Sequence, residues 1–223
     1  MFQRLKLISV MLTVCVAAAA AQTPAVSTDS LQRSNFAVAA SFDVNIPSGS
    51  RGTWTAGSGA TLGGCYAYRF SDRLFAATGL DVFYRTLGTQ YMIADNSLFE
   101  GTVKNIGLRI PFMIGYSFDL SQQVAMSVAT GPGLEVNLYA RESAMPDFGG
   151  STAVSTGSVN LFHRGFKRVD AIWGIALGFT FAEHYYCGIT ASAAFTPLAK
   201  FGNRDNKLRV RSHTVAVKLS YKF

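Results

Sequence analysis

The sequence predicts an all-β protein, an eight-stranded antiparallel up-and-down transmembrane β-barrel. Three features of the 223 residues predict this fold. The first is an N-terminal secretion signal, and the second is a set of segments in which apolar residues alternate with small or polar ones. The third is that the links between these segments are alternately short and long. Hydrophobic residues make up 49% of the chain, yet no apolar run after the signal reaches the about 18 residues expected of a spanning helix. The apolar side chains must therefore fill a core or face lipid from strands.

The start of the chain has the three parts of a secretory signal peptide. Arg4 and Lys6 give a basic beginning, residues 7–21 are almost wholly apolar, and the run closes on small residues at Ala19-Ala20-Ala21. We expect cleavage near Ala21. The predicted organisation is therefore a signal peptide over residues 1–21, a flexible leader over 22–34 and an outer-membrane β-barrel over 35–223.

Eight segments of the mature chain alternate apolar residues with small or polar ones, as strands with one lipid-facing side do. In the clearest, 103–118, apolar residues from Ile106 to Phe118 occupy every second position. Phe83 departs from the pattern, because the phase of its segment sends it to the polar side. Several segments exceed the about 9–11 residues with which a tilted strand crosses the hydrocarbon. The predicted strands are 35–46, 59–70, 73–86, 103–118, 122–140, 166–181, 185–195 and 208–223.

The links between these segments alternate strictly in length. The short links are 71–72, 119–121 and 182–184, and the long ones are 47–58, 87–102, 141–165 and 196–207. Outer-membrane barrels have short periplasmic turns and longer extracellular loops, so we expect the cell outer membrane as the location. Ten strands are the alternative, if residues 28–34 or the third long link add a hairpin. Aromatic residues near the strand ends predict two interfacial girdles, and those at the outer edge are Tyr84, Tyr139, Phe166 and Phe195.

The strand phases send nine charged residues into the lumen of the barrel. An eight-stranded barrel has an interior just wide enough for side chains to fill, and buried charges persist when they are paired. We therefore predict a filled, ion-paired lumen, with a charge-selective pore as the alternative. Glycines at inward positions would make room for the arginines and aromatic side chains opposite them. The predicted lumen charge network is Asp43, Arg69, Asp81, Arg85, Arg109, Glu135, Arg168, Asp170 and Lys218.

Pro111 lies inside the most regular predicted strand. Proline cannot donate to a strand ladder, so it predicts a local bulge or bend at that point. A ligand entrance or a lateral opening of the wall is the alternative interpretation.

No pattern of residues indicates catalysis or a cofactor, and we expect neither. The histidines, His163, His184 and His213, have no metal-ligand spacing. His163 and Ser158 share a long link and could serve as base and nucleophile of a lipid-modifying enzyme, but nothing in the sequence orients them. We therefore do not expect an enzyme.

The mature chain keeps Cys65 and Cys187, which do not form a disulfide framework. A lipid anchor on Cys15 is not favoured, because the residues before it are not small. Removal of the two cations in the signal lowers the formal net charge from +7 to +5. No basic cluster indicates a nucleic-acid partner, and the excess charge suits anionic lipid headgroups.

Several motifs together resemble small outer-membrane β-barrel proteins of the Bacteroidetes. Leu108-Arg109-Ile110-Pro111-Phe112, running into Gly115-Tyr116-Ser117-Phe118, resembles their fourth strand, and Ala129-Thr130-Gly131-Pro132-Gly133 resembles the fifth. Asp170 with Gly174 and Gly178 resembles the sixth. The ending Tyr221-Lys222-Phe223 resembles the C-terminal signal, here Tyr221 and Phe223, that the barrel-assembly machinery reads. The resemblance covers roughly residues 35–223. The members of this family include the PorT-type barrel, a component of gliding and protein secretion.

These observations favour an outer-membrane barrel with a structural or interaction role. The alternative is a pore or a component of a transport or protein-secretion complex of the PorT type, and a lipid-modifying enzyme is less favoured. The expected partners are outer-membrane lipid, the barrel-assembly machinery and envelope or secretion-complex proteins.

Overall fold

The computed structural model describes residues 33–49, 54–92, 98–146, 158–201 and 208–223. These residues form strands and a short 3-10 helix, η1 (Leu161–Arg164). The predicted signal peptide and nearly all of the leader lie outside the described residues. No helix in the described part of the chain is long and apolar enough to cross a membrane. The strands are β1 (Ser34–Ser48), β2 (Trp54–Thr55), β3 (Gly57–Arg69), β4 (Leu74–Met92), β5 (Leu98–Asp119), β6 (Val124–Pro146), β7 (Ser158–Asn160), β8 (Val169–Phe181), β9 (Tyr185–Ala194), β10 (Ala199–Phe201) and β11 (Leu208–Lys222).

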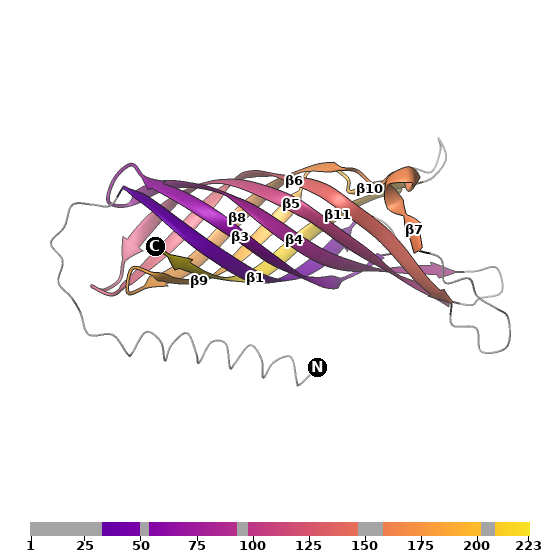
Figure 1. The fold of residues 1–223 in the computed structure, drawn as a ribbon, viewed down its shortest axis with the longest axis horizontal. Coiled ribbons are helices and arrows are strands. Elements are labelled where there is room, and N and C mark those ends of the chain that lie inside the picture. The colour runs from indigo at the N-terminus through magenta and orange to yellow at the C-terminus, as the bar shows by residue number, and fades with distance from the viewer. Residues whose placement is uncertain (1–32, 50–53, 93–97, 147–157, 202–207) are drawn as a thin grey trace, which may run out of the picture.

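Eight long strands close into a barrel (Figure 1). The antiparallel order is β1, β3, β4, β5, β6, β8, β9 and β11, and β11 pairs back to β1. The short strands β2, β7 and β10 pair with β4, β6 and β11. Closure pairs the edge strands, as a sheet in hydrocarbon requires. The prediction of eight strands is confirmed, and the ten-stranded alternative is wrong for the described residues, where the third long link adds only β7 and η1.

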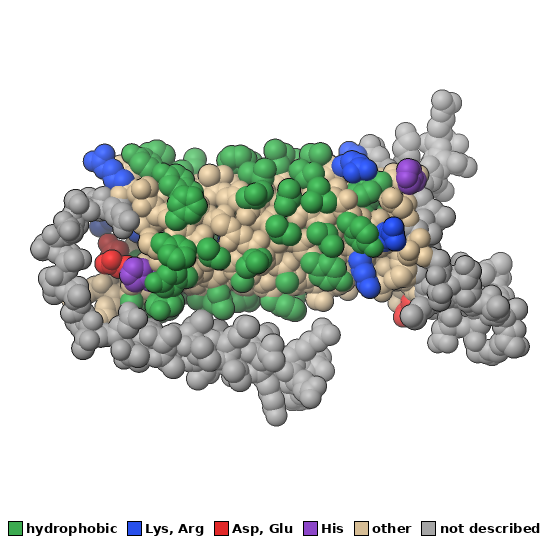
Figure 2. Space-filling model, in the orientation of Figure 1, with side chains coloured by type: hydrophobic (Ala, Val, Ile, Leu, Met, Phe, Trp, Pro, Cys, Tyr) green, Lys and Arg blue, Asp and Glu red, His purple; other side chains and the backbone are tan. Residues whose placement is uncertain are grey.

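The outer wall of the barrel is apolar, because every second residue of the long strands points outward. Phe36, Leu62 and Ile114 are 62%, 63% and 62% exposed. Figure 2 shows hydrophobic side chains over the middle of the wall and Lys and Arg toward its two ends. Ring pairs form a girdle at the end with the short turns, with centroid separations of 5.5 Å for Phe36–Tyr66, 5.3 Å for Tyr68–Phe70, 4.7 Å for Tyr116–Phe118, 6.4 Å for Phe179–Phe181 and 5.3 Å for Tyr185–Tyr221.

Three neighbouring strands run well past the length that a membrane needs. β4, β5 and β6 contain 19, 22 and 23 residues, whereas about 9–11 residues suffice for a tilted crossing. The extra length lies at the end with the long links, so a sheet extension projects there (Figure 1). Much of the predicted link 87–102 is therefore strand, and it pairs from Leu87↔Val103 to Met92↔Leu98.

A β-bulge in β6 changes which residues face the lumen. The register of β5 and β6 shifts between Ile106 and Gly107, which pair with Tyr139 and Asn137 and leave Leu138 as the extra residue. Leu138 and Tyr139 both point outward, at 53% and 40% exposed. The expectation of a bulge at Pro111 is wrong. Pro111↔Gly133 and Ile114↔Thr130 continue one register, and the irregularity lies earlier in β5, between Ile106 and Gly107.

Candidate functional site

The lumen contains three layers, and an apolar one lies nearest the long links. We call it the apolar cap, and each of its six residues is at most 4% exposed. Leu87, Val103 and Ala140 come from strands, whereas Leu161, Phe166 and Leu198 come from the links. Phe166 is a correction to the predicted outer girdle, because the link carries its ring into the barrel mouth. The other three girdle residues point outward, Tyr84 at 41%, Tyr139 at 40% and Phe195 at 58% exposed.

The next layer is centred on a buried ion triad. Glu135 accepts hydrogen bonds from Arg85, with Nη2 to Oε2 at 3.0 Å, and from Arg109, with Nη2 and Nε at 2.7 and 2.8 Å from Oε1. The side chains of Arg85, Arg109 and Glu135 are 3%, 12% and 2% exposed. The ring of Phe83 lies beside both guanidinium groups, at 4.7 Å from Arg85 and 5.4 Å from Arg109. The phase that sends Phe83 inward thus supplies a cation–π partner for two buried cations.

Amide side chains extend this charged layer across the barrel. The Asn137 side-chain oxygen accepts hydrogen bonds from Arg85 at 3.0 Å and from Asn105 at 2.7 Å. Asn137 also donates to the backbone oxygen of Lys167 at 2.9 Å, and Thr214 donates to Asn45 at 2.9 Å. Asn45, Asn105 and Asn137 are at most 1% exposed. Sequence reasoning that counted charges missed these asparagines, although their inward phase is visible in the sequence.

Two of the predicted acids meet hydroxyl groups instead of arginines. Asp43 accepts hydrogen bonds from Ser41 at 2.6 Å and from Thr61 at 2.5 Å. Asp170 accepts one from Thr196. Neither carboxylate forms an ion pair with a described residue. Among the described residues, the ion pairs of the lumen are therefore those of the triad.

The remaining predicted residues divide between the lumen and the rim. Asp81, Arg69 and Lys218 line a cavity below the charged layer. Arg168 is exposed and its guanidinium carbon lies 4.4 Å from the centre of the Phe162 ring. Its predicted place in the lumen is wrong, because β8 begins at Val169 and the phase of the strand does not extend to the residue before it.

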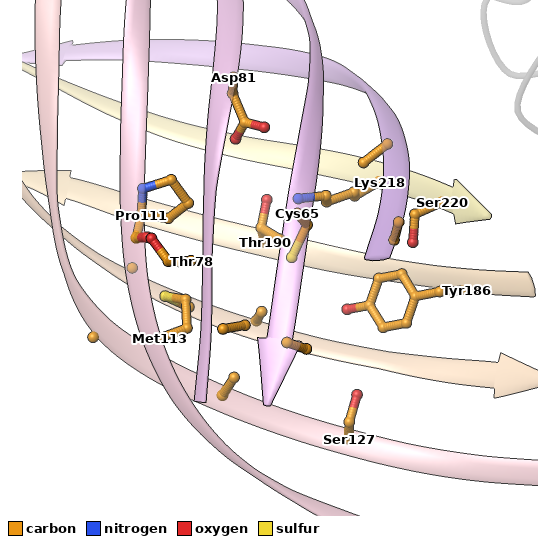
Figure 3. A pocket seen from close by; sticks show the side chains of 18 of the residues that line it. Cys65, Thr78, Asp81, Pro111, Met113, Ser127, Tyr186, Thr190, Lys218 and Ser220 are labelled. Carbon is orange, nitrogen blue, oxygen red and sulfur yellow. The ribbon is translucent and has the colours of Figure 1, made fainter. Parts of the chain in front are cut away.

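The third layer, at the short-turn end, is a hollow that we call the lumen cavity (Figure 3). Its volume is about 220 Å³. The inward residues of this half are mostly small, such as Ala37, Ala77 and Ala129, so they leave the centre of the barrel empty. Its larger inward residues include Met113, Tyr186 and Lys218, which Figure 3 labels.

Some inward glycines make room for rings, as the sequence predicts. A Cβ on Gly107 would lie 2.5 Å from Phe83, and one on Gly178 would lie 2.5 Å from the ring of Tyr186. Gly174 differs, because a Cβ there would meet Met113 at 3.7 Å, an ordinary contact distance. This glycine therefore borders free space in the lumen cavity.

The predicted assembly signal lies on the outer surface at the short-turn end. The rings of Tyr221 and Phe223 are 5.2 Å apart, and His184 stacks on Tyr221 at 5.7 Å. The backbone N–H of Phe223 donates to the backbone oxygen of Phe36 at 2.8 Å, which joins the last residue to the first long strand. Recognition of these residues by the assembly machinery stays a prediction.

The other residues singled out in the sequence have separate surroundings. Ser158 accepts a hydrogen bond from Arg141 at 3.4 Å, and His163 is exposed on η1. His213 Nε2 lies 2.7 Å from the Ser48 hydroxyl. In the described ranges no group of three or more His, Cys, Asp or Glu side chains could hold a metal ion. Cys65 and Cys187 are not joined in a disulfide.

This closed sheet, with its lipid-facing wall and its packed outer lumen, defines a β-barrel of the outer-membrane class. The family model described as "Outer membrane protein beta-barrel domain" matches residues 8–223. The chain therefore belongs to that family, and its location is the outer membrane. The short-turn end of the barrel accordingly faces the periplasm.

Solved structures of other barrels are similar to this chain. Neisserial surface protein A has 18% identity and a TM-score of 0.40, over 84% of this chain and 97% of that one. Ail, the attachment invasion locus protein of Yersinia pestis, has 14% identity and a TM-score of 0.42, over 85% and 97%. OprG from Pseudomonas aeruginosa has 14% identity and a TM-score of 0.44, over 85% and 95%. No curated protein matches the sequence.

Proposed function

We propose that this protein is a closed outer-membrane barrel with a structural or interaction role and that it does not conduct solutes. The observation that carries the proposal is the buried triad of Arg85, Arg109 and Glu135, which projects into the lumen from the neighbouring strands β4, β5 and β6 beneath the apolar cap. Opening this path would separate buried charges from their partners, which is strongly unfavourable. The cap adds a second barrier made of side chains that are at most 4% exposed.

Planar-bilayer recording tests the closed lumen. Purified protein inserted into a bilayer should give no stable channel of porin size, with a known porin measured in parallel as a positive control. A stable open channel whose conductance changes in the Glu135→Gln variant would contradict the proposal, because the current would then pass through this lumen. A current that also appears in a mock preparation from cells lacking the protein comes from a contaminating porin and does not count against the proposal.

The interaction role is supported by the sheet extension beyond the membrane. Lys104 and Arg141 lie directly opposite each other in the ladder of β5 and β6, and both are exposed. Like charges directly opposite in a sheet destabilise it, so an anionic partner would stabilise this pair. Their row lies next to outward-facing Ile106 and Tyr139, near the edge of the lipid-facing wall. We expect phosphate-bearing outer-membrane lipid to bind there.

Lipid analysis of the purified protein tests this partner. Protein extracted gently from its native membrane should retain phosphorylated lipid, and the Lys104→Gln/Arg141→Gln double variant should retain less. Arg73→Gln is a matched control, because Arg73 is an exposed cation at the opposite end. Equal retention by all three proteins would remove the lipid partner.

The second candidate is a component of a transport or protein-secretion complex. Its support is the sequence resemblance to PorT-type barrels together with the projecting extension of β4, β5 and β6. The same gentle purification, analysed for proteins, should then give stoichiometric envelope partners. Their absence, with the barrel intact by its heat-dependent gel shift, would favour the first proposal. A lipid-modifying activity is the least favoured, and a changed lipid A profile on deletion of the gene would support it.

A further inference from the structure

We propose that the lumen cavity binds one single-chain amphiphile with an anionic headgroup, such as a fatty acid or a lysophospholipid. This inference concerns the periplasmic half of the barrel and goes beyond the proposed closed-barrel role. It rests on three features of the cavity: an excess of cations, an apolar wall of small residues, and a size suited to one chain.

The cavity has more cations than carboxylates. Four cations line it, Arg69, Arg109, Lys218 and Lys222, and Asp81 is the one carboxylate among the lining residues of the described chain. Arg109 is paired with Glu135 of the charged layer, whereas the other three cations form no ion pair with a described residue. Lys222 donates a hydrogen bond to the neutral hydroxyl of Thr180 at 3.2 Å. A negative group is therefore the missing complement of this cavity.

Two of these cations mark the mouth of the cavity. Arg69 is the last residue of β3 and Lys222 the last of β11, so both lie at the short-turn end. Both line the same cavity, so their like charges repel each other within one confined space. Charges in a confined lumen are screened by salt less than charges on an open surface. A carboxylate or phosphate between them would relieve the repulsion and gain two charge-assisted hydrogen bonds.

Above the mouth the wall suits an alkyl chain. Ala37, Ala77 and Ala129 supply small apolar side chains, and Met113, the ladder partner of Ala77, and Pro111 line the same cavity (Figure 3). Methionine adapts its shape to apolar ligands because its side chain is flexible and polarisable. We therefore place the headgroup between Arg69 and Lys222 and the chain toward Met113.

The size of the cavity selects the kind of lipid. Its volume of about 220 Å³ is below the about 300–1,000 Å³ of pockets for drug-sized ligands. One short chain fits this space better than the two chains of a phospholipid. The charged layer and the apolar cap close the outer end, so the ligand enters from the periplasm.

Methyl NMR of the barrel in nanodiscs tests the proposal directly. Met113 lines the cavity, whereas Met126 pairs with the outward-facing Phe118 and Phe179 and reports on the lipid side. Decanoate and a short-chain lysophosphatidate should each shift the Met113 methyl signal with saturation, and the stronger of the two identifies the headgroup. Decanol and decyltrimethylammonium should leave it unchanged. If the Met113 and Met126 signals move together for all four probes, the ligand only partitions into lipid and the proposal fails.

Charge variants test the position of the headgroup. Arg69→Gln and Lys222→Gln should each weaken decanoate binding by about tenfold, because each removes one charge-assisted contact. Arg73→Gln should bind decanoate as the parent does, since Arg73 contacts the Tyr116 hydroxyl on the outside, at 3.4 Å. Unchanged affinity in both cavity variants, with the heat-dependent gel shift intact, would overturn the assignment.

A cavity-filling variant keeps the proposal testable if the charge variants fold poorly. A Cβ at Gly174 would lie 3.7 Å from the Met113 side chain and 3.8 Å from the nearest backbone atom, so Gly174→Leu should add bulk inside the cavity. Equilibrium dialysis should show loss of decanoate binding in this variant, although all cations remain. Full binding in the folded variant would mean that the chain lies elsewhere. Neither result depends on whether the barrel conducts.

Discussion

The two halves of the lumen are built by the same eight strands, yet one is filled and the other is hollow. In the outer half, inward positions carry large or charged side chains such as Phe83, Arg85 and Glu135, all at most 2% exposed. In the periplasmic half, positions on the same strands carry Ala77 and Ala129, and a cavity of about 220 Å³ remains. Strand number sets the width of a barrel. Side-chain size then decides whether that width is solid or empty.

The largest expected effect comes from removing the acid of the outer half. Glu135→Ala leaves the guanidinium groups of Arg85 and Arg109 buried without their carboxylate, which should cost about 3–5 kcal/mol of unfolding free energy. Lys218→Ala, in the hollow half, should cost less than about 1 kcal/mol, because Lys218 forms no ion pair with a described residue and its removal leaves no buried charge unpaired. Urea unfolding in liposomes, followed by the gel shift, measures both. Similar losses for the two variants would remove the distinction between the halves.

A pair of glycine substitutions compares how far each half can adjust. Gly107→Ala places its Cβ 2.4 Å from the backbone oxygen of Val136 and 2.5 Å from Phe83, which is held in the packed layer. Overpacking of this kind should cost about 1–3 kcal/mol. Gly178→Ala meets the ring of Tyr186, which can turn into the cavity, so its cost should be at the low end of that range. The same unfolding measurement applies, and a greater loss in Gly178→Ala would show that Tyr186 is fixed.

Thiol labelling compares the accessibility of the two halves. Cys65 lines the cavity, and Ala194 faces the packed half at 5% exposed. In variants that keep one cysteine, a small charged thiosulfonate should modify Cys65 about tenfold faster than a cysteine introduced by Ala194→Cys, because burial away from water slows thiolate formation. Mass spectrometry gives both rates. Equal rates would mean that water reaches the outer half as freely as the cavity.

The smallest expected effect concerns the rim. Arg168→Gln should lower the unfolding free energy by about 0.5–1 kcal/mol, the size of an exposed cation–π contact. The contact is with Phe162, at 4.4 Å from its ring centre. A loss of unfolding free energy as large as that of Glu135→Ala would indicate that Arg168 belongs to the buried lumen network after all.

Most of the barrel could be predicted from the strand pattern, because period-two alternation assigns each residue of a strand to the lipid side or the lumen side. Phe83 illustrates this, since its phase alone sends it inward and it is 1% exposed. Arg168 shows the limit, because phase holds only within a strand and β8 begins one residue later. Leu138 shows a second limit of the prediction. A bulge arises from the pairing of two strands, so the alternation within one strand does not reveal where it occurs.

The candidate site was harder to predict than the wall. The apolar cap draws Leu161, Phe166 and Leu198 from links, where alternation gives no information. The hollow half left a weak signal in the sequence, namely inward positions near the short turns that carry small residues such as Ala77 and Ala129. The inward charges gave the stronger signal, but the partners of Asp43 and Asp170 are hydroxyl groups, which the charge pattern did not predict.

The seam between β1 and β11 gives the barrel an all-or-none assembly. It joins residues as distant as Ala37 and Lys222, and the last N–H of the chain bonds to Phe36. Until this seam forms, both strands present unpaired amides, and each costs several kcal/mol in hydrocarbon. A nascent chain that lacks its final strand therefore has no stable place in the bilayer. Insertion must therefore wait until β11 has been synthesised and exported.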